Sequence, residues 1–171
     1  MEPLVTKTEL LSRLEREYAR LAAVLASLTA EQWTVRGGIG SWSVKDMLAH
    51  VIAHQERARE ELRYAIRGER LEIDHSAVDA FNAQAAQTRK TDSVAVVLAA
   101  WHDSYQQLVS LVEGLSEADF SPTSALAQAL DDTIDGALGN NTYEHYAEHR
   151  AEIEAWLRGV SNSGGDEITA P

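Results

Sequence analysis

Four long segments of this chain carry apolar residues at steps of three and four, the spacing that gathers them on one face of an α-helix. In the first segment, Leu10, Leu14, Leu21 and Leu25 recur between charged residues. We place the four segments at about residues 7–27, 44–67 and 94–114, and from a start between 130 and 137 to about 158. No segment shows the alternation of a strand, so the sequence predicts an all-α fold.

Capping residues and a glycine mark the ends of the second segment. Ser43 and Asp46 match the pattern in which a hydroxyl and an acidic side chain satisfy the first N–H groups of a helix. Gly68 is a natural helix terminator. Residues 69–92 are polar and weakly patterned, and we expect them to form a crossover with a short helix near 77–86.

Four helices joined by one long crossover are expected to pack as a four-helix bundle. The length of 171 residues suits a single domain, which we assign to residues 1–158. The tail at 159–171 consists of small and polar residues, a composition that predicts disorder.

The charge balance favours some partners and excludes others. The chain carries 27 acidic and 15 basic side chains, a formal net charge of −12. Sequence-independent binding to nucleic acid requires Lys and Arg that displace counterions, so we expect neither nucleic acid nor an anionic membrane as a partner. The longest apolar run, 94–101, is too short to span a bilayer, and the first residues lack a signal-peptide pattern. A cytoplasmic location is therefore expected.

The sequence contains no cysteine, so any metal ion must be held by histidine and carboxylate ligands. His145 and His149 are four residues apart, which places both rings on one helical face, about 6 Å apart along the axis. His50 and His54 repeat this spacing, although roughly 0.2 such pairs are expected by chance in a chain of this length and histidine content. From spacing alone, a metal site and unrelated polar roles both remain open.

Two sequence segments that contain these histidines resemble a known family. The segments WSVKDMLAH at 42–50 and NTYEHYAEHRAEI at 141–153 are similar to the DinB-like superfamily, and the opening TKTELLSRLEREYARL looks like its DfsB/ClbS branch. The resemblance implies a four-helix bundle with a long connection between the second and third helices. It also implies a divalent metal ion (Zn²⁺, Ni²⁺, Mn²⁺ or Fe²⁺) held by His50, His145 and His149.

Further residues are candidates for the surroundings of that metal ion. His54 stands where family members often carry an aromatic residue, which leaves open a fourth ligand, a proton carrier or a packing group. We expect it to support a ligand or line the pocket, rather than to be a plain surface histidine. Asn141 lies one turn before His145, where it could orient a ligand or bond to the helix backbone instead. Glu148 and Glu152 would serve as bases only if they turned inward, and their spacing favours solvent. The other pocket candidates are Trp42, Tyr143, Trp101, Tyr105, Tyr64 and Asn82, with core packing as the competing explanation for the aromatic ones.

The resemblance implies metal-assisted hydrolysis, or transfer of a nucleophile such as a thiol, on a small electrophilic molecule, in detoxification or self-resistance. Because the chain has no cysteine, a low-molecular-weight thiol would have to come from solution. The alternative is a non-catalytic bundle that binds or sequesters a small molecule, with a vestigial or absent metal. A small-molecule substrate and a second copy in a homodimer are the expected partners, the dimer on the resemblance alone.

Overall fold

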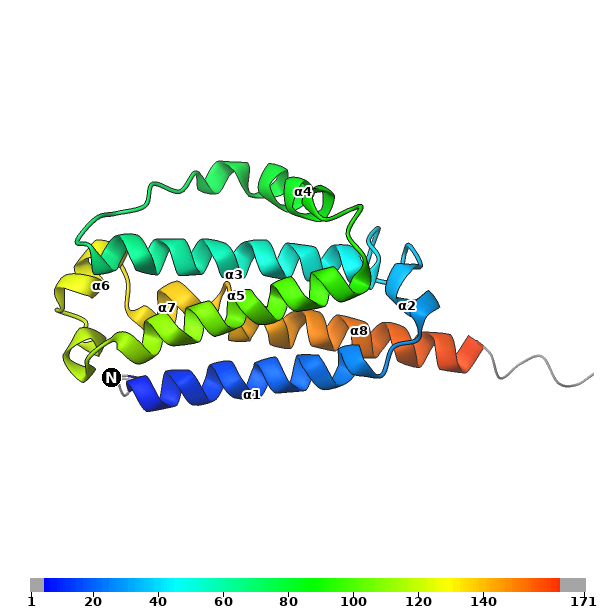
Figure 1. Cartoon of the computed structure of the whole chain (residues 1–171), viewed down its shortest axis with the longest axis horizontal. Coiled ribbons are helices and arrows are strands. Elements are labelled where there is room, and N and C mark those ends of the chain that lie inside the picture. The colour runs from blue at the N-terminus through cyan, green and yellow to red at the C-terminus, as the bar shows by residue number, and fades with distance from the viewer. Residues whose placement is uncertain (1–4, 164–171) are drawn as a thin grey trace, which may run out of the picture.

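The computed structural model describes residues 5–163, and in that range the regular elements are helices, apart from an isolated bridge between Ile39 and Trp42. Four long helices form the body of the molecule (Figure 1). They are α1 (Lys7–Ala26), α3 (Val44–Ile66), α5 (Val94–Gly114) and α8 (Tyr143–Ser163), and the short α2 (Ala30–Thr34) follows α1. The predicted all-α four-helix bundle is confirmed.

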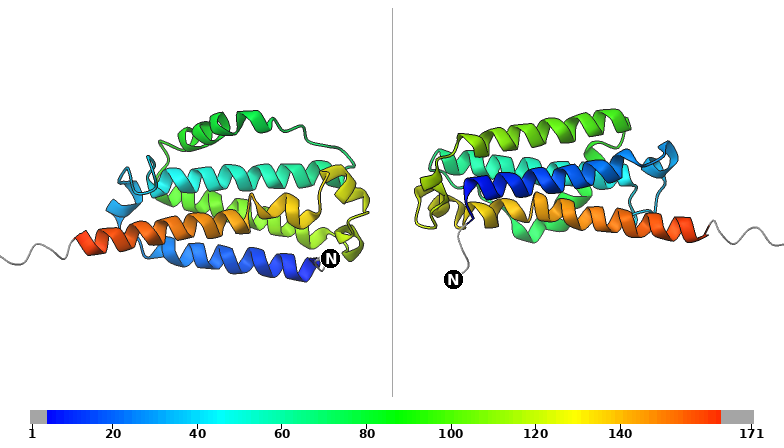
Figure 2. Two further views of the ribbon diagram at one scale, coloured as in Figure 1. Left: turned by 180° about the vertical axis from the view of Figure 1, so that it is seen from behind. Right: turned by 90° about the horizontal axis from the view of Figure 1, so that it is seen from below.

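The crossover between α3 and α5 covers one side of the bundle. It contains a short 3-10 helix, η1 (His75–Ala77), and α4 (Val78–Thr88), which packs on the outer side of α3 (Figures 1 and 2). Behind it, α3 packs on α5, and α1 packs on α8. Nζ of Lys45 on α3 donates to the carbonyl oxygens of Lys90 and Asp92 at 2.9 and 2.8 Å. The predicted crossover is therefore present and is tied to the helix that it covers.

The start of α3 is fixed by the capping box that the sequence predicts. Oγ of Ser43 accepts from the backbone N–H of Asp46 at 3.1 Å, and Oδ2 of Asp46 accepts from the backbone N–H of Ser43 at 3.1 Å. The helix ends at Ile66, and Gly68 follows with a φ of +74°, a left-handed conformation that costs glycine no steric strain. Helix α3 thus ends within one residue of the predicted boundary.

The connection from α5 to α8 differs from the prediction. It contains three short helices, η2 (Glu117–Phe120), α6 (Ala125–Leu130) and α7 (Ile134–Gly139). Asp131 ends α6 in the left-handed conformation, with a φ of 57°, and Thr133 then caps α7. The last long helix therefore begins at Tyr143, and the predicted start between 130 and 137 is wrong.

The same helix also extends further than expected. It reaches Ser163, so residues 159–163 of the predicted tail are helical. Residues 164–171 of that tail lie outside the described residues, and the single domain at 1–158 stays a prediction. Within the described range, none of the helices combines the length and the apolar character that crossing a membrane requires.

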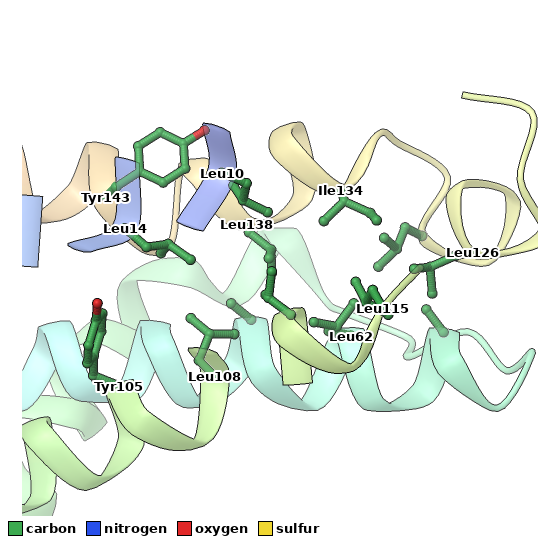
Figure 3. Close-up of a cluster of buried hydrophobic side chains, with 14 residues drawn as sticks. Leu10, Leu14, Leu62, Tyr105, Leu108, Leu115, Leu126, Ile134, Leu138 and Tyr143 are labelled. Atoms are coloured by element: carbon green, nitrogen blue, oxygen red, sulfur yellow. The ribbon is translucent and has the colours of Figure 1, made fainter. Parts of the chain in front are cut away.

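Two apolar clusters fill the bundle, one toward each end. In the first, Leu10 and Leu14 of α1 meet Leu62 of α3 and Leu108 of α5, and α6 and α7 close the end (Figure 3). Each fully buried leucine of this kind contributes about 1.5–3 kcal/mol to folding. The second cluster includes Leu21, Leu48, Val97, Tyr146 and Ile153. Members of this second cluster flank His50 on α3 and His149 on α8 in the sequence.

Candidate metal centre

Three histidines from two helices meet inside the bundle. His50 belongs to α3, and His145 and His149 come from successive turns of α8. Nε2 of His145 lies 3.0 Å from Nε2 of His50 and 2.8 Å from Nε2 of His149. The ring nitrogens that the three residues offer all lie within 4.8 Å of one another. We call these three residues the histidine triad.

Helix packing places the triad where water has little access. The exposed fractions of His50, His145 and His149 are 4%, 8% and 9%. The indole of Trp42, just before α3, lies 5.1 Å from the ring of His50, measured between ring centroids. Trp42, a predicted pocket aromatic, thus lies against the triad.

Burial is the main reason why two of these rings have low pKa values. Burial, followed by the nearby rings of His54 and His149, lowers the pKa of His50 to about 3. Burial and then the rings of His149, His54 and His50 lower the pKa of His145 to about 2. Both rings are therefore neutral near pH 7, the state in which an imidazole nitrogen can bind a metal ion.

A carboxylate fixes the orientation of the third ring. Nδ1 of His149 lies 2.7 Å from Oε2 of Glu152, three residues later on α8. Because a carboxylate accepts, Nδ1 carries the proton, and in the neutral ring Nε2 presents its lone pair to the rest of the triad. Glu152 is exposed, as its spacing predicts, yet it sets the tautomer of His149.

Three neutral rings cannot satisfy both contacts within the triad with their own protons. If Nε2 of His149 accepts, Nε2 of His145 must carry a proton and donate it to His149. Nε2 of His145 then has no lone pair left for His50, so its contact with Nε2 of His50 must share the same proton. A divalent ion instead accepts a lone pair from each of the three nitrogens. Nδ1 of His50 and of His145 then carry the protons, and both atoms are buried without a hydrogen-bond partner among the described residues. The donor set fits a divalent ion such as Zn²⁺, with a supporting carboxylate at His149.

His54 lies beside the triad, one turn after His50 on α3. Its ring centroid is 4.4 Å from that of His50 and 4.6 Å from that of His145. Nδ1 of His54 lies 2.9 Å from Oδ1 of Asn141, and Nε2 lies 2.9 Å from Oδ1 of Asn82. His54 is therefore held between α4 and the start of α8, with both ring nitrogens engaged away from the triad.

Three of the predicted pocket aromatics make their contacts in the core instead. Tyr143 belongs to the first apolar cluster (Figure 3), and its hydroxyl donates to Oδ1 of Asp135 at 2.6 Å. Trp101 and Tyr105 lie on α5, which contributes no histidine to the triad, and both stack on Tyr18 of α1. Stacking of large apolar rings explains the positions of Trp101 and Tyr105, and burial in the first apolar cluster explains that of Tyr143.

A cavity of about 510 Å³ opens beside His54. Its walls come from α3, from residues 70–73 and Val78 of the crossover, and from the α6–α7 region. Asn141 also lines it, so the amide that holds His54 faces the cavity. None of the three triad histidines is among the described residues that line this cavity. His54 lines the cavity and also contacts the rings of His50 and His145, so it lies between the cavity and the triad.

Two partners of the histidines were not assigned from the sequence. Glu152 follows His149 at a spacing of three, which brings side chains together on a helix and was the available signal. Asn82 was a pocket candidate, but its pairing with His54 depends on how α4 lies on α3, and no local pattern reveals that.

Comparisons with known proteins agree with this architecture. The model of the DinB superfamily matches residues 13–153. A crystal structure of an uncharacterised protein from Escherichia coli UTI89 has a TM-score of 0.81 at 14% identity and covers 92% of this chain and 95% of that one. The colibactin self-resistance protein ClbS, crystallised with double-stranded DNA, has a TM-score of 0.77 at 16% identity and covers 99% and 100%. No curated protein matches this sequence significantly.

The complex of ClbS with DNA overturns one expectation. The net charge of −12 was the reason for excluding nucleic acid as a partner. A protein of the same fold is bound to double-stranded DNA in a crystal, so that exclusion is wrong. Net charge describes the whole molecule, whereas binding to DNA depends on where the basic groups lie.

Proposed function

Because this chain belongs to the DinB superfamily, we propose that the histidine triad holds a divalent metal ion and acts on a small electrophilic molecule. The reaction class is metal-assisted hydrolysis, or transfer of a nucleophile to that molecule. The similarity to ClbS, a self-resistance protein, supports a role in detoxification or self-resistance.

One observation carries the proposal, the convergence of three buried imidazole nitrogens within 4.8 Å of one another. A site with three protein nitrogens leaves a coordination position for substrate, which is the composition of catalytic rather than structural zinc sites. A divalent ion there would supply Lewis-acid activation of the electrophile or of its attacking nucleophile.

The residues of the chain have separate tasks in this proposal. Glu152 holds the proton on Nδ1 of His149 and so keeps Nε2 available as a ligand atom. Asn82 and Asn141 hold His54 at the boundary between the triad and the cavity. A thiol nucleophile must come from solution as a low-molecular-weight co-substrate, because the chain has no cysteine.

Metal analysis tests the ligand assignment. Tag-free protein is exposed in turn to Zn²⁺, Ni²⁺, Mn²⁺ and Fe²⁺, desalted and analysed by mass spectrometry of the metal. We expect about one equivalent in the wild type and none in the variant His145→Ala/His149→Ala. The control is His102→Ala, an exposed histidine on α5 whose Nδ1 lies 2.9 Å from the hydroxyl of Tyr18. A wild type that retains none of the four ions contradicts the proposal.

Turnover distinguishes an enzyme from a sequestering protein. Metal-loaded protein is incubated with activated esters and epoxides, with and without a thiol, and products are identified by mass spectrometry. Multiple turnovers that the double variant loses support the enzyme. Stoichiometric capture without release would instead identify a non-catalytic binding protein. Double-stranded DNA is included as a further ligand because ClbS was crystallised with it.

A further inference from the structure

We propose that the groove between α1 and α5 binds a protonated amine with an apolar body, and that Glu15, Glu113 and the hydroxyl of Tyr105 hold the ammonium group. Neither of these helices contributes a histidine to the triad, so this site is separate from the candidate metal centre. The inference therefore goes beyond the proposed function and does not depend on it.

The groove follows α1 and α5 where these two helices lie side by side (Figure 1). Its volume of about 780 Å³ lies within the range of about 300–1,000 Å³ that is typical of ligand pockets. Most of its surface is apolar and comes from small and aliphatic side chains, namely Leu11, Ala19, Ala22, Ala23 and Val109. Such a lining suits an apolar ligand body.

The charged side chains of the groove are acidic. Glu15 of α1 and Glu113 of α5 line it, and no Lys or Arg is among the described residues that do so. Both side chains are exposed, and within residues 5–163 neither carboxylate has an ion pair or a hydrogen bond. Nζ of Lys7 donates to the backbone oxygens of Glu113 and Leu115 at 2.5 and 2.7 Å, and not to the carboxylate of Glu113. The groove is thus complementary to a cation.

A nearly buried hydroxyl without a partner is a second, independent indication of a ligand. Tyr105 is 7% exposed, its hydroxyl points away from α5 (Figure 3), and this hydroxyl forms no hydrogen bond with any of the described residues. The hydroxyl of Tyr18, which also lines the groove, instead lies 2.9 Å from Nδ1 of His102. Buried polar groups normally have partners. Because Tyr105 lines the groove, a ligand bound there can supply the missing one.

The two carboxylates lie close enough to this hydroxyl to act on it. Burial is the main reason why the pKa of Tyr105 rises to about 12, and the charges of Glu15 and Glu113 contribute. The hydroxyl is therefore neutral near pH 7, and its oxygen can accept a hydrogen bond. An ammonium group has three N–H donors, which match two carboxylates and one phenol oxygen.

A second copy of this chain fits the groove less well than a small cation does. A symmetric contact centred on the groove would bring Glu15 and Glu113 of both copies together, and none of the described lining residues is a Lys or Arg that could offset them. The net charge of −12 on each copy adds to the repulsion. A small ammonium ion meets the same carboxylates without this cost.

Three probes that share one alkyl chain test the inference, namely octylamine, octan-1-ol and octanoate. Each is titrated into the full-length protein by calorimetry at pH 7, where octylamine is protonated. We expect octylamine to bind the wild type most tightly and octanoate to bind it most weakly, because the groove is acidic.

Two variants remove the groups that hold the ammonium ion. Glu15→Gln/Glu113→Gln removes both charges, and Tyr105→Phe removes the hydroxyl and keeps the ring. Each should weaken the binding of octylamine by about fivefold. Affinity for octan-1-ol should stay unchanged in Glu15→Gln/Glu113→Gln, which shows that the groove is still formed, and circular dichroism checks the folding of both variants.

The matched control is Glu72→Gln/Asp132→Asn. It removes two exposed carboxylates from the cavity beside His54, which is a second place where an ammonium ion could gather. This control should bind octylamine as tightly as the wild type does.

Several results would overturn the inference. They are octylamine that does not bind at millimolar concentration, octylamine that binds either groove variant as tightly as the wild type, and a loss of affinity confined to the control. Sedimentation of the same samples tests a second copy as the occupant. A dimer that octylamine dissociates would assign the groove to that copy and would also contradict the inference.

Discussion

The exposed carboxylate of Glu152 determines which ring nitrogen of the buried His149 carries the proton. The side chain of Glu152 is 46% exposed, so as an ion pair it would contribute little to stability. Its effect is on chemistry, because it holds one proton in place and thereby decides which nitrogen of His149 can bind a metal. Removing this acceptor should therefore change metal affinity much more than folding.

We expect Glu152→Ala, which removes the acceptor, to lower metal affinity by about 10- to 100-fold, as loss of such supporting groups does in metal sites. Competition with a chromophoric chelator measures the affinity, and urea unfolding checks that stability is close to wild type. Glu148→Ala removes the same charge from an exposed position on the same helix and should bind metal as the wild type does. Equal loss in both variants would show that only the charge of the helix matters.

The sequence could reveal the three histidines of the candidate site but not all of their surroundings. His145 and His149 are recognisable because helical spacing brings them together, and His50 because its neighbours resemble a family pattern. The contact of His54 with Asn82 and the position of Arg57 over Phe81 both join α3 to the crossover. Such contacts depend on how the crossover lies on the helix, which no local spacing encodes.

At the scale of elements, the start of α3 matters for the triad because His50 lies in its second turn. The capping box of Ser43 and Asp46 satisfies the first N–H groups, and Ser43 is almost fully buried, with 3% exposed. Water cannot easily replace a lost cap at a buried helix end. Fraying of this end would therefore loosen the turn that carries His50.

Replacing Ser43 by Ala should lower the free energy of unfolding by about 0.5–2 kcal/mol. Urea unfolding followed by circular dichroism measures the change. Ser93→Ala is the matched control, since Ser93 caps α5 with a single contact to the N–H of Val96 at an exposed helix end. Its loss should cost less, and a larger loss for Ser93→Ala than for Ser43→Ala would refute the role given to the buried cap.

The long helices could be predicted from the sequence, whereas the connection from α5 to α8 could not. An apolar period needs several turns to be recognised, and α6 and α7 contain fewer than two turns each. The break between them depends on Asp131 in the left-handed conformation, which non-glycine residues seldom adopt. Apolar residues from 126 to 138 therefore resembled the first turns of the last helix.

At the scale of the whole molecule, two buried neutral histidines make folding sensitive to acid. In the unfolded chain these rings titrate near 6.5, whereas burial lowers the pKa of His50 to about 3 and of His145 to about 2. Below pH 6.5 the unfolded chain binds protons that the folded protein does not, so acid favours unfolding. This contribution to stability is present above about pH 6.5 and is lost as the pH falls toward 3.

We expect the metal-free protein to lose up to about 1.4 kcal/mol of unfolding free energy per buried histidine for each pH unit below 6.5. Urea titrations between pH 7 and pH 5, in the presence of a chelator, measure the slope. His145→Gln should reduce the slope, and His102→Ala should leave it at the wild-type value. Equal stability at both ends of the range would contradict the burial of neutral rings.

The crossover over α3 supplies Asn82 and one wall of the cavity, whereas all three triad histidines come from long helices. The wall of the cavity and the three histidines thus come from different stretches of the chain. Substitutions among the crossover residues that line the cavity can change its shape while the three histidines keep their places on the long helices.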